Sequence, residues 1–352
     1  MEFIKCLAEQ LRIHRHSQPR DVVKMCYQAA FGAEHLLGDL DAAREYFYRE
    51  YHSVEPVSGH IFEPISPYTC RVNMGAWRAA GLDPSWLFNM FVSSIGPQSP
   101  GDETFLQYLT QAEELIGSGT TGMDLEEYKL FIQEYLQNGI SPVHHSDTYR
   151  QGEKPAYRLA DCRFMTLLPV LEKISYLPNR EKTTVIAIDG PAASGKSTLG
   201  RMLQQILGAG VVHMDDFFLP GELRTEERLS EAGGNIHYER FVEQVLPYVS
   251  DPKEFSYQVF DCSAMAMGEM RTVSQSGYRI VEGSYSHHPR FGNFADLRIF
   301  IEIDAELQKQ RIINRNGEAL WKMFHKAWIP LENKYFENFA IKLAADLVVS
   351  GQ

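Results

Sequence analysis

The stretch Thr184-Val-Ile-Ala-Ile-Asp-Gly-Pro-Ala-Ala-Ser-Gly-Lys-Ser-Thr198 decides the fold of the second half of the chain. An apolar run stops at Gly190, and an amphipathic pattern follows Gly195, which indicates a buried strand, a tight loop and a helix. The spacing of these glycines before Lys196 and Ser197 matches G-x-x-x-x-G-K-[ST]. In such a loop, backbone N–H groups and the start of the helix surround a phosphate group. The sequence therefore predicts a nucleotide site.

The residues expected to hold ATP are those of the loop and of the first helical turn: Gly190, Ala192, Ala193, Ser194, Gly195, Lys196, Ser197 and Thr198. Lys196 is expected to reach the β- and γ-phosphates, and Ser197 is expected to ligate Mg²⁺. The alternative is a glycine-rich turn that carries a lysine by chance. The buried type of strand before the loop and the amphipathic helix after it favour the nucleotide site.

Charge and cysteine content restrict the partners of the protein. A formal net charge of −12 argues against a general nucleic-acid or anionic-membrane partner, because phosphate surfaces attract basic proteins. Residues 1–11 carry charges where a signal peptide needs an apolar core, and no apolar run approaches the ~18 residues of a membrane span. The five cysteines are scattered, as is typical of reduced thiols. We expect a cytoplasmic protein that binds small molecules, and a homo-oligomer is compatible with these features.

Residues 1–178 show no alternation of strands and helices, and they are predicted to form a mainly α-helical domain. Apolar residues at helical spacing predict the helices Asp21–Phe31, Ala42–Tyr51, Thr104–Ile116 and Asp124–Gln137. Asp21, Asp41 and Asp124 are expected to be N-caps. No catalytic spacing is visible in this domain. We therefore hypothesise a regulatory or substrate-delivering role for it.

Two polar stretches of this domain, at 31–37 and 141–158, contain side chains that could form a metal or phosphate pocket. These are Glu34, His35, His144, His145, Asp147, Arg150 and Arg158. However, adjacent histidines on a loop point in different directions, and the spacing matches no metal motif such as H-E-x-x-H. The interpretation that we favour is a packed, hydrogen-bonded His35 and a polar turn at 144–147.

A proline and a charge cluster at Leu177–Lys182 mark the expected boundary, so that the second domain covers residues 179–352. Its predicted strand Val211–Met214 ends at Asp215 and Asp216, and ligands gather at the carboxyl ends of parallel strands. One of the two aspartates is expected to accept a proton from a substrate hydroxyl. The alternative for two aspartates after a strand is a helix cap or a turn.

Two further features of the second domain fit phosphoryl chemistry. Glu282 ends the predicted strand Tyr278–Gly283, where a second acidic contact to Mg²⁺ or its water is expected. Arg311 and Arg315 lie one helical turn apart and are expected to clamp a transferring phosphoryl group, although a solvated basic face is the alternative. The other strands predicted for a parallel sheet are Phe255–Phe260, Leu297–Ile303 and Leu347–Val349.

Residues 183–352 resemble the uridine kinase and phosphoribulokinase group of P-loop kinases. The matching motifs occur in the expected order: the phosphate loop, Asp215-Asp-Phe-Phe218, Gly233-Gly-Asn235 with Arg240-Phe241, Glu282-Gly283, and Phe294–Phe300 leading to Asp304 and the two arginines. The resemblance implies an α/β P-loop kinase domain, a parallel sheet with helices on both faces, preceded by the mainly helical domain.

The resemblance also implies roles for single residues. Asp215 becomes the catalytic base, Ser197 and Glu282 organise Mg²⁺, and the two arginines belong to a lid. Asp216 is kept as a further Mg²⁺ candidate. The chain departs from the family in two places. Uridine kinases place a histidine for the pyrimidine base shortly after a Tyr-Asp pair, but residues 260–267 read Phe-Asp-Cys-Ser-Ala-Met-Ala-Met. The lid after Arg315 is also short.

We therefore predict an enzyme that uses ATP and Mg²⁺ to phosphorylate a small molecule, with the 5′-hydroxyl of a nucleoside as the acceptor. Two alternatives remain open. The acceptor could be another metabolite, such as pantothenate or a sugar phosphate, because a fold does not select its substrate. The second domain could also be a nucleotide-sensing ATPase switch, with the helical domain as its output. A base candidate at Asp215 favours the kinase over the switch.

Overall fold

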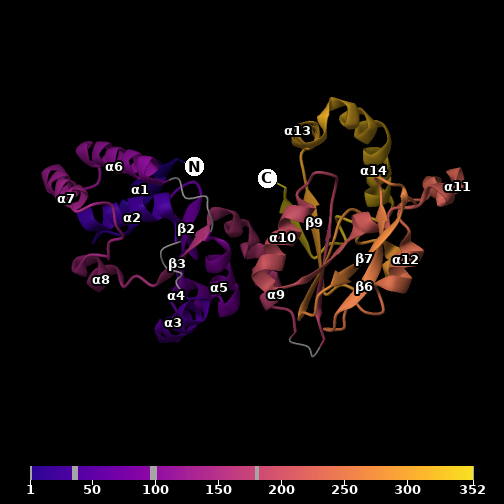
Figure 1. The fold of residues 1–352 in the computed structure, drawn as a ribbon, viewed down its shortest axis with the longest axis horizontal. Helices are drawn as coiled ribbons and strands as arrows, with labels where there is room; N and C mark the ends of the chain where they lie inside the picture. Colours follow the sequence, from indigo (N-terminus) through magenta and orange to yellow (C-terminus); the bar gives the residue numbers. More distant parts are fainter. Residues whose placement is uncertain (1, 34–38, 96–100, 179–181, 352) are drawn as a thin grey trace. The chain divides into compact units, whose positions relative to one another are not determined.

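The computed structural model describes residues 2–33, 39–95, 101–178 and 182–351. The chain divides into two compact units, Met1–Ser175 and Tyr176–Gln352 (Figure 1). Among the described residues, no helix combines the length and the apolar character needed to cross a bilayer.

The first unit is mainly helical, as the sequence predicts. Its helices are α1 (Phe3–Ile13), α2 (Pro19–Phe31), α3 (Leu40–Ser53), α4 (Met74–Ala79), α5 (Pro84–Ser93), α6 (Gly101–Gly117), α7 (Leu125–Gln137), α8 (Asp147–Glu153) and α9 (Leu168–Ser175), with a 3₁₀ turn, η2, at Cys162–Leu167. Asp124 is the N-cap of α7, as expected, because its side chain accepts the N–H of Glu127. The other two cap predictions are wrong: Asp39 caps α3, and Gln18 caps α2. Both helices begin earlier than their apolar periodicity indicates.

A three-stranded antiparallel sheet, which the sequence analysis missed, lies in the first unit. Its strands are β1 (Phe62–Pro64), β2 (Thr69–Asn73) and β3 (Tyr157–Asp161), and β2 is the middle strand. In β2, Cys70, Arg71 and Val72 are all buried, so both faces of this strand are covered. These short strands are far apart in the sequence, and β2 alternates poorly between polar and apolar residues. Periodicity alone therefore did not reveal them.

The second unit contains a five-stranded parallel sheet in the order β10-β9-β4-β8-β5. The strands are β4 (Thr184–Asp189), β5 (Gly210–His213), β8 (Tyr278–Glu282), β9 (Leu297–Glu302) and β10 (Leu347–Ser350). The central strand β4 is buried from Val185 to Asp189, which requires cover on both faces, as is usual for parallel sheets. Helix α10 (Lys196–Leu207) packs against β4, β5 and β8. This parallel α/β fold confirms the predicted fold class.

One predicted strand lies outside this sheet. β6 (Phe255–Asp261) pairs antiparallel with β7 (Ala266–Val273) and forms a two-stranded hairpin, with a register shift between Gln258 and Phe260. The placement of Phe255–Phe260 in the parallel sheet is therefore wrong. The strand itself is present, but only four residues separate β6 from β7, too few for the crossover that a parallel pair requires. Short helical segments precede the hairpin: η3 (Met214–Phe217), η4 (Gly221–Leu223), α11 (Glu226–Ser230) and α12 (Tyr238–Gln244).

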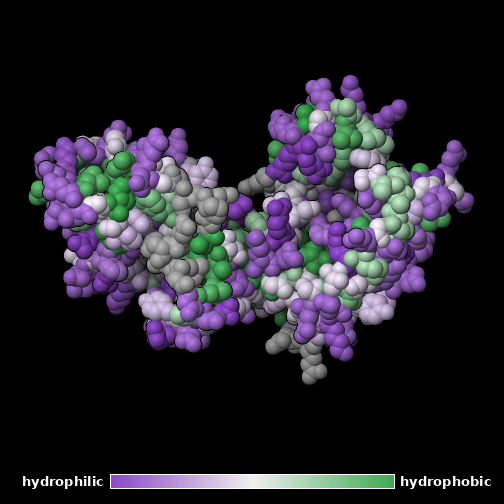
Figure 2. Space-filling model, in the orientation of Figure 1, coloured by the Kyte–Doolittle hydropathy of each residue, from purple (hydrophilic) through white to green (hydrophobic). Residues whose placement is uncertain are grey.

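The segment after β9 forms a long bent helical arm. Helix α13 (Ala305–Met323) continues through a π-helical turn, η6 (Phe324–Trp328), into α14 (Ile329–Asn338) (Figure 1). Gly317 breaks α13 with a φ of 80° and a ψ of 166°, values outside the helical region. Apolar side chains interrupt the hydrophilic surface of this arm (Figure 2), and Met323 and Trp328 are 44% and 40% exposed. The arm is longer than the short lid that the sequence suggested.

Candidate active site

The phosphate loop joins β4 to α10 through backbone conformations that its sequence makes accessible. Gly190 has a φ of 145°, and a Cβ atom there would lie 2.3 Å from the carbonyl oxygen of Ile301. Gly195, at the N-cap of α10, has a φ of 108°. Only glycine adopts such angles at low cost, and only glycine allows the close approach to β9. The two glycines of the motif thus fix the shape of the loop.

The side chains of the loop are arranged to receive an anion. Lys196 is buried, and its ammonium group donates to the carbonyl oxygens of Gly190 at 2.7 Å and Pro191 at 2.8 Å. Ser194 is 1% exposed, and its hydroxyl has no hydrogen-bond partner within the described part of the chain. A cation held only by neutral oxygens and an orphaned buried donor fit a phosphate group. Thr198 is exposed on the first turn of α10.

The end of β8 approaches the first turn of α10. The hydroxyl of Ser197 donates to Glu282 Oε2 at 3.0 Å, while His213 Nδ1 lies 2.6 Å from Glu282 Oε1. Glu282 is only 5% exposed. No group of three or more histidine, cysteine, aspartate or glutamate side chains among the described residues could enclose a metal ion. Mg²⁺ needs no such cage, because it binds through one or two protein oxygens together with phosphates and water, so Ser197 and Glu282 fit it.

The two aspartates after β5 have different environments. The Asp215 carboxylate is exposed and accepts no hydrogen bond from the described residues. Protein atoms crowded around it raise its pKa by desolvation, while the charge of Lys196 lowers it and that of Glu282 raises it. Asp216, by contrast, is buried, and it accepts from Tyr257 at 2.7 Å and from Arg271 at 2.5 Å.

This contrast separates the roles of the two carboxylates. The side-chain partners of Asp216 lie on the β6–β7 hairpin. Arg240, which belongs to α12, also donates to the backbone carbonyl of Asp216. Asp216 therefore ties the hairpin to the segment that carries Asp215. Both side-chain donors bind the same oxygen atom, Oδ2, and Oδ1 accepts no hydrogen bond from the described residues, so the role of Asp216 as a Mg²⁺ ligand stays a prediction.

The two candidate arginines are not brought together. Arg311 Nη1 donates to the carbonyl oxygen of Ala193 at 3.2 Å, which places it on the phosphate loop. Arg315 is exposed and donates to Asn316 Oδ1 at 2.7 Å. Gln308, one turn before Arg311, donates to the carbonyl oxygen of Ala192 at 2.9 Å. Within the described residues, α13 contacts the loop through Gln308 and Arg311, and no hydrogen bond links Arg315 to it.

Glu332, on α14, is a site residue that sequence reasoning missed. Its Oε2 atom accepts the N–H of Ala192 at 2.9 Å, and its Oε1 atom accepts the hydroxyl of Ser284 at 2.7 Å. Burial raises the pKa of Glu332, while Lys196 and its hydrogen-bond donors lower it. No local pattern marks Glu332, because it lies more than a hundred positions from the loop that it contacts.

A second missed residue, Asp189, holds the loop from beneath. Asp189 is fully buried at the end of β4. Its carboxylate accepts hydrogen bonds from the backbone N–H groups of Gly190, Tyr285 and His287. It also accepts one from the hydroxyl of Tyr335, at 2.8 Å. These contacts join the loop, the turn after β8, and α14. The sequence showed only an aspartate within an apolar strand, which has no distinguishing pattern.

The polar residues singled out in the first unit do not converge. His145 is buried against Asp21, whereas His144, Asp147 and Arg150 are exposed, and Arg158 pairs with Glu50 at 2.7 Å. Glu34 and His35 lie outside the described residues, so the packing expected for His35 stays a prediction. The buried side chain near His145 that the sequence analysis missed is Arg71.

The parallel sheet and the phosphate loop define the second unit as a parallel α/β domain with a P-loop, the fold class that the sequence predicted. No model of a known family matches the chain. Among curated proteins, the chain is similar to the pantothenate kinase of Klebsiella pneumoniae subsp. pneumoniae, with 26% identity over 198 residues that cover 49% of this chain and 60% of that protein. The pantothenate kinase of Enterobacter sp. is 26% identical over 207 residues, which cover 51% of this chain and 62% of the relative. The chain thus spans about three fifths of the length of these curated relatives.

Two solved structures align with about half of the chain. A protein described as a possible uridine kinase from Bacillus stearothermophilus aligns with a TM-score of 0.41 and 22% identity, covering 52% of this chain and 97% of that chain. D-glycerate 3-kinase from Cryptococcus neoformans aligns with a TM-score of 0.37 and 14% identity, covering 54% of this chain and 94% of that chain.

Proposed function

We propose that the second unit transfers the γ-phosphoryl group of ATP to a hydroxyl group of a small molecule. The observation that carries this proposal is the contrast at the end of β5, where Asp215 has no hydrogen-bond partner among the described residues and Asp216 Oδ2 accepts from Tyr257 and Arg271. A free carboxylate within the electrostatic range of Lys196 fits the base of a kinase. The curated relatives are named as kinases, which supports the same class.

In this proposal each residue of the site has a defined task. Loop N–H groups, Lys196 and Arg311 bind and orient the phosphates, and Ser197 and Glu282 hold Mg²⁺. When bound, Mg²⁺ neutralises negative charge on the phosphates. Asp215 takes the proton from the acceptor hydroxyl, and the oxygen of that hydroxyl attacks the γ-phosphorus while the bond from this phosphorus to the β,γ-bridging oxygen breaks and ADP leaves. The raised pKa of Asp215 brings this base closer to the working pH, which favours proton transfer.

The β6–β7 hairpin is the segment that we assign to acceptor binding, because Tyr257 and Arg271 attach it beside Asp215 through Asp216. Met267 and Met270 are 40% and 61% exposed on this hairpin. Flexible thioether side chains suit contacts with apolar parts of a ligand. We propose a nucleoside 5′-hydroxyl as the first acceptor to test, on the resemblance to uridine kinases.

Pantothenate is the second acceptor, and a specific observation favours it. The curated relatives described above are named pantothenate kinases, and residues 260–267 lack the histidine with which uridine kinases hold the pyrimidine base. Both acceptors present a primary hydroxyl group to Asp215. We also propose that the chain has two domains, 1–178 and 179–352, and that the first regulates the second or delivers its substrate.

A coupled assay of ATP consumption tests these proposals. Purified full-length protein is incubated with Mg·ATP and, separately, with nucleosides, pantothenate and sugar phosphates, and each product is identified by mass. ADP formation that requires one acceptor and yields its phosphate ester supports the kinase and names the substrate. ADP formation that no acceptor stimulates would instead support an ATPase switch.

A further inference from the structure

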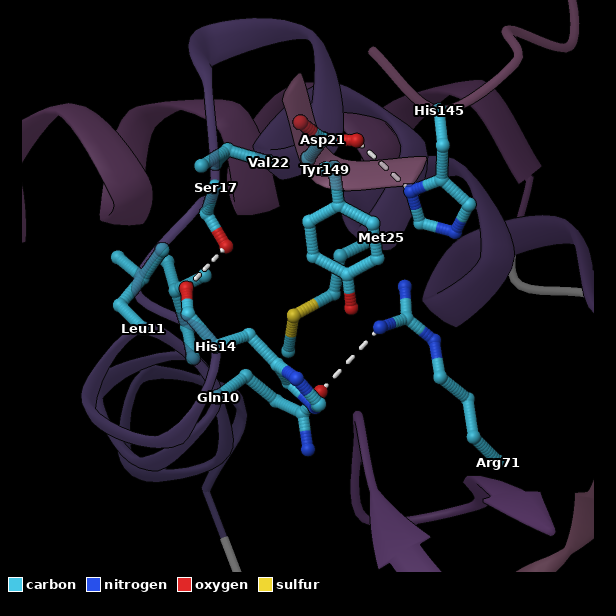
Figure 3. A pocket seen from close by; sticks show the side chains of 11 residues that line it. Gln10, Leu11, His14, Ser17, Asp21, Val22, Met25, Arg71, His145 and Tyr149 are labelled. Atoms are coloured by element: carbon cyan, nitrogen blue, oxygen red, sulfur yellow. Dashed lines mark hydrogen bonds and ion pairs between the residues drawn. The ribbon is translucent and has the colours of Figure 1, made fainter. Parts of the chain in front are cut away.

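The first unit contains a pocket between α1, α2, α8 and β2 that the proposed kinase chemistry does not use (Figure 3). Arg71 of β2 and Tyr149 of α8 line it, together with Gln10, His14 and His145. Arg71 and Tyr149 are 4% and 3% exposed. Two polar side chains that are so deeply buried at one pocket need partners, because desolvation of an unpaired polar group is costly.

The guanidinium group of Arg71 is held entirely by neutral groups. Its Nε and Nη2 atoms donate to Gln28 Oε1 at 3.2 and 2.9 Å, and Nη1 donates to Gln10 Oε1 at 3.2 Å. The group also lies over the ring of Tyr157, 4.7 Å from its centroid. No carboxylate of residues 2–33, 39–95 or 101–178 is within ion-pair distance of it. These contacts use three of the five N–H donors of an arginine, so two remain.

The carboxylates around this pocket are engaged by histidines. Asp21 lies 2.7 Å from His145 Nδ1, and it also accepts from the backbone and the hydroxyl of Ser146. Glu63 and Glu153 lie 3.0 and 3.1 Å from the two ring nitrogens of His14. The positive charge of Arg71 is therefore left without a bound counter-charge. Burial lowers the pKa of Arg71, but Tyr157 and Tyr149, followed by the carboxylates of Glu63 and Asp21, outweigh this effect, so the pKa is raised.

A second, independent observation points to a ligand. The hydroxyl of Tyr149 has no hydrogen-bond partner among the described residues, and Figure 3 shows it pointing into the pocket toward the guanidinium of Arg71. The Tyr149 ring is fixed in this direction by stacking on His145, with centroids 4.3 Å apart and planes at 5°. The unused O–H donor of Tyr149 and the guanidinium group of Arg71 thus line the same pocket.

We propose that this pocket, whose enclosed cavity of about 10 Å³ must widen to admit a group larger than a water molecule, binds a small oxyanion, the phosphate or carboxylate group of a metabolite. The two free N–H donors of Arg71 would bind two of its oxygen atoms, and Tyr149 would donate to one of them. Arginine is suited to this task because its planar fork matches the geometry of such groups. The oxyanion would supply the counter-charge that Arg71 lacks. The proposal does not depend on phosphoryl transfer by the second unit.

The test is isothermal titration calorimetry of the full-length chain with inorganic phosphate and, separately, with acetate, at constant ionic strength. The phosphate loop could also bind these probes, so every titration uses a Lys196→Ala background. Saturable binding of phosphate alone would indicate a phosphoryl ligand, and binding of acetate would indicate a carboxylate. The absence of saturable binding by either probe would overturn the proposal.

Variants of the two donors test the assignment. Tyr149→Phe keeps the stacked ring and removes only the hydroxyl, so it should weaken binding of the probe by about fivefold, the effect of one hydrogen bond. Arg71→Lys, which loses the fork, should weaken binding by about tenfold or more. The matched control is Arg158→Lys on the neighbouring strand, where the arginine already pairs with Glu50. If Arg71→Lys does not fold, Tyr149→Phe decides, and unchanged binding by that folded variant would overturn the assignment.

Discussion

Ser197 Oγ donates a hydrogen bond to Glu282 Oε2 at 3.0 Å, and this contact joins the first turn of α10 to the end of β8. His213 holds the other oxygen of the same carboxylate. The proposed Mg²⁺ site is thus arranged before any ion binds. Glu282→Gln keeps the shape of the side chain but removes its charge, so we expect the Mg²⁺ concentration for half-maximal activity to rise by about tenfold.

The Mg²⁺ requirement is measured by varying the ion at saturating ATP. The control is Glu302→Gln, at the end of the neighbouring strand β9, where the carboxylate pairs with Lys342 instead. An unchanged Mg²⁺ requirement in the Glu282 variant would remove this residue from the metal site.

Asp215→Asn tests the base. The variant should bind ATP normally but lose about 10²- to 10⁴-fold in kcat, the usual contribution of a general base. Asp251→Asn, at an exposed turn, serves as the control. Desolvation raises the pKa of Asp215, and a base works only when deprotonated, so kcat/KM of the unmodified protein should rise with pH through that raised pKa. Undiminished transfer by Asp215→Asn would show that another group takes the proton.

Lys196→Ala tests the phosphate loop. Lys196 now donates to two loop carbonyls, and in the proposed complex it turns to the phosphates. Its removal should lower kcat/KM by about 10²-fold or more, since the charge of a phosphoryl group in transfer is then less neutralised. The exposed Lys253→Ala is the control. Normal turnover by Lys196→Ala would mean that the loop is not catalytic.

Glu332→Gln tests a carboxylate that faces the nucleotide site. Glu332 accepts a loop N–H, that of Ala192, and any negative charge on it opposes binding of phosphates. The variant should bind ATP about three- to tenfold more tightly, measured by calorimetry. Glu337→Gln, an exposed residue of the same helix, controls for changes in α14. Weaker ATP binding by Glu332→Gln would show that the carboxylate supports the loop rather than competing with its ligand.

The sequence predicted the candidate site residues that stand at the ends of apolar strands. The phosphate loop, Asp215 and Glu282 each follow an apolar strand, and a parallel sheet brings the ends of such strands together. Asp189 and Glu332 escaped prediction because their partners are distant in the sequence, and so did Arg71, which has no recognisable motif around it. Contacts of this kind depend on how helices pack across a unit, and local periodicity does not report them.

The β6–β7 hairpin shows that sequence patterns predict a strand without predicting its partner. The apolar pattern predicted the strand Phe255–Phe260 correctly, but it contained no information about its partner. The register of β6 and β7 places the strand outside the parallel sheet. The Asp216–Arg271 ion pair then fixes the hairpin beside Asp215, and this pair depends on that register. Strand existence was therefore predictable here, whereas strand pairing was not.

His145 makes the stability of the first unit depend on pH. Desolvation lowers the pKa of this histidine to about 4, with Asp21 opposing the shift, whereas in the unfolded chain it titrates near its ordinary value of ~6.5. Between these values the unfolded chain binds more protons, so the free energy of unfolding should fall as the pH drops from about 6.5 to about 4. For a side chain that is 8% exposed, the loss attributable to His145 is at most about 3 kcal/mol.

Urea unfolding of the full-length chain between pH 7 and pH 5 measures this loss. His145→Gln should show a smaller decrease in the free energy of unfolding than the unmodified protein, because glutamine does not titrate. His144→Gln replaces the exposed neighbour and should retain the full decrease. If the free energies of unfolding of His145→Gln and His144→Gln decrease by the same amount across this pH range, the buried histidine is not the group that titrates. A steeper loss in His145→Gln would mean that its protonated form stabilises the fold, the reverse of the sign derived from its lowered pKa.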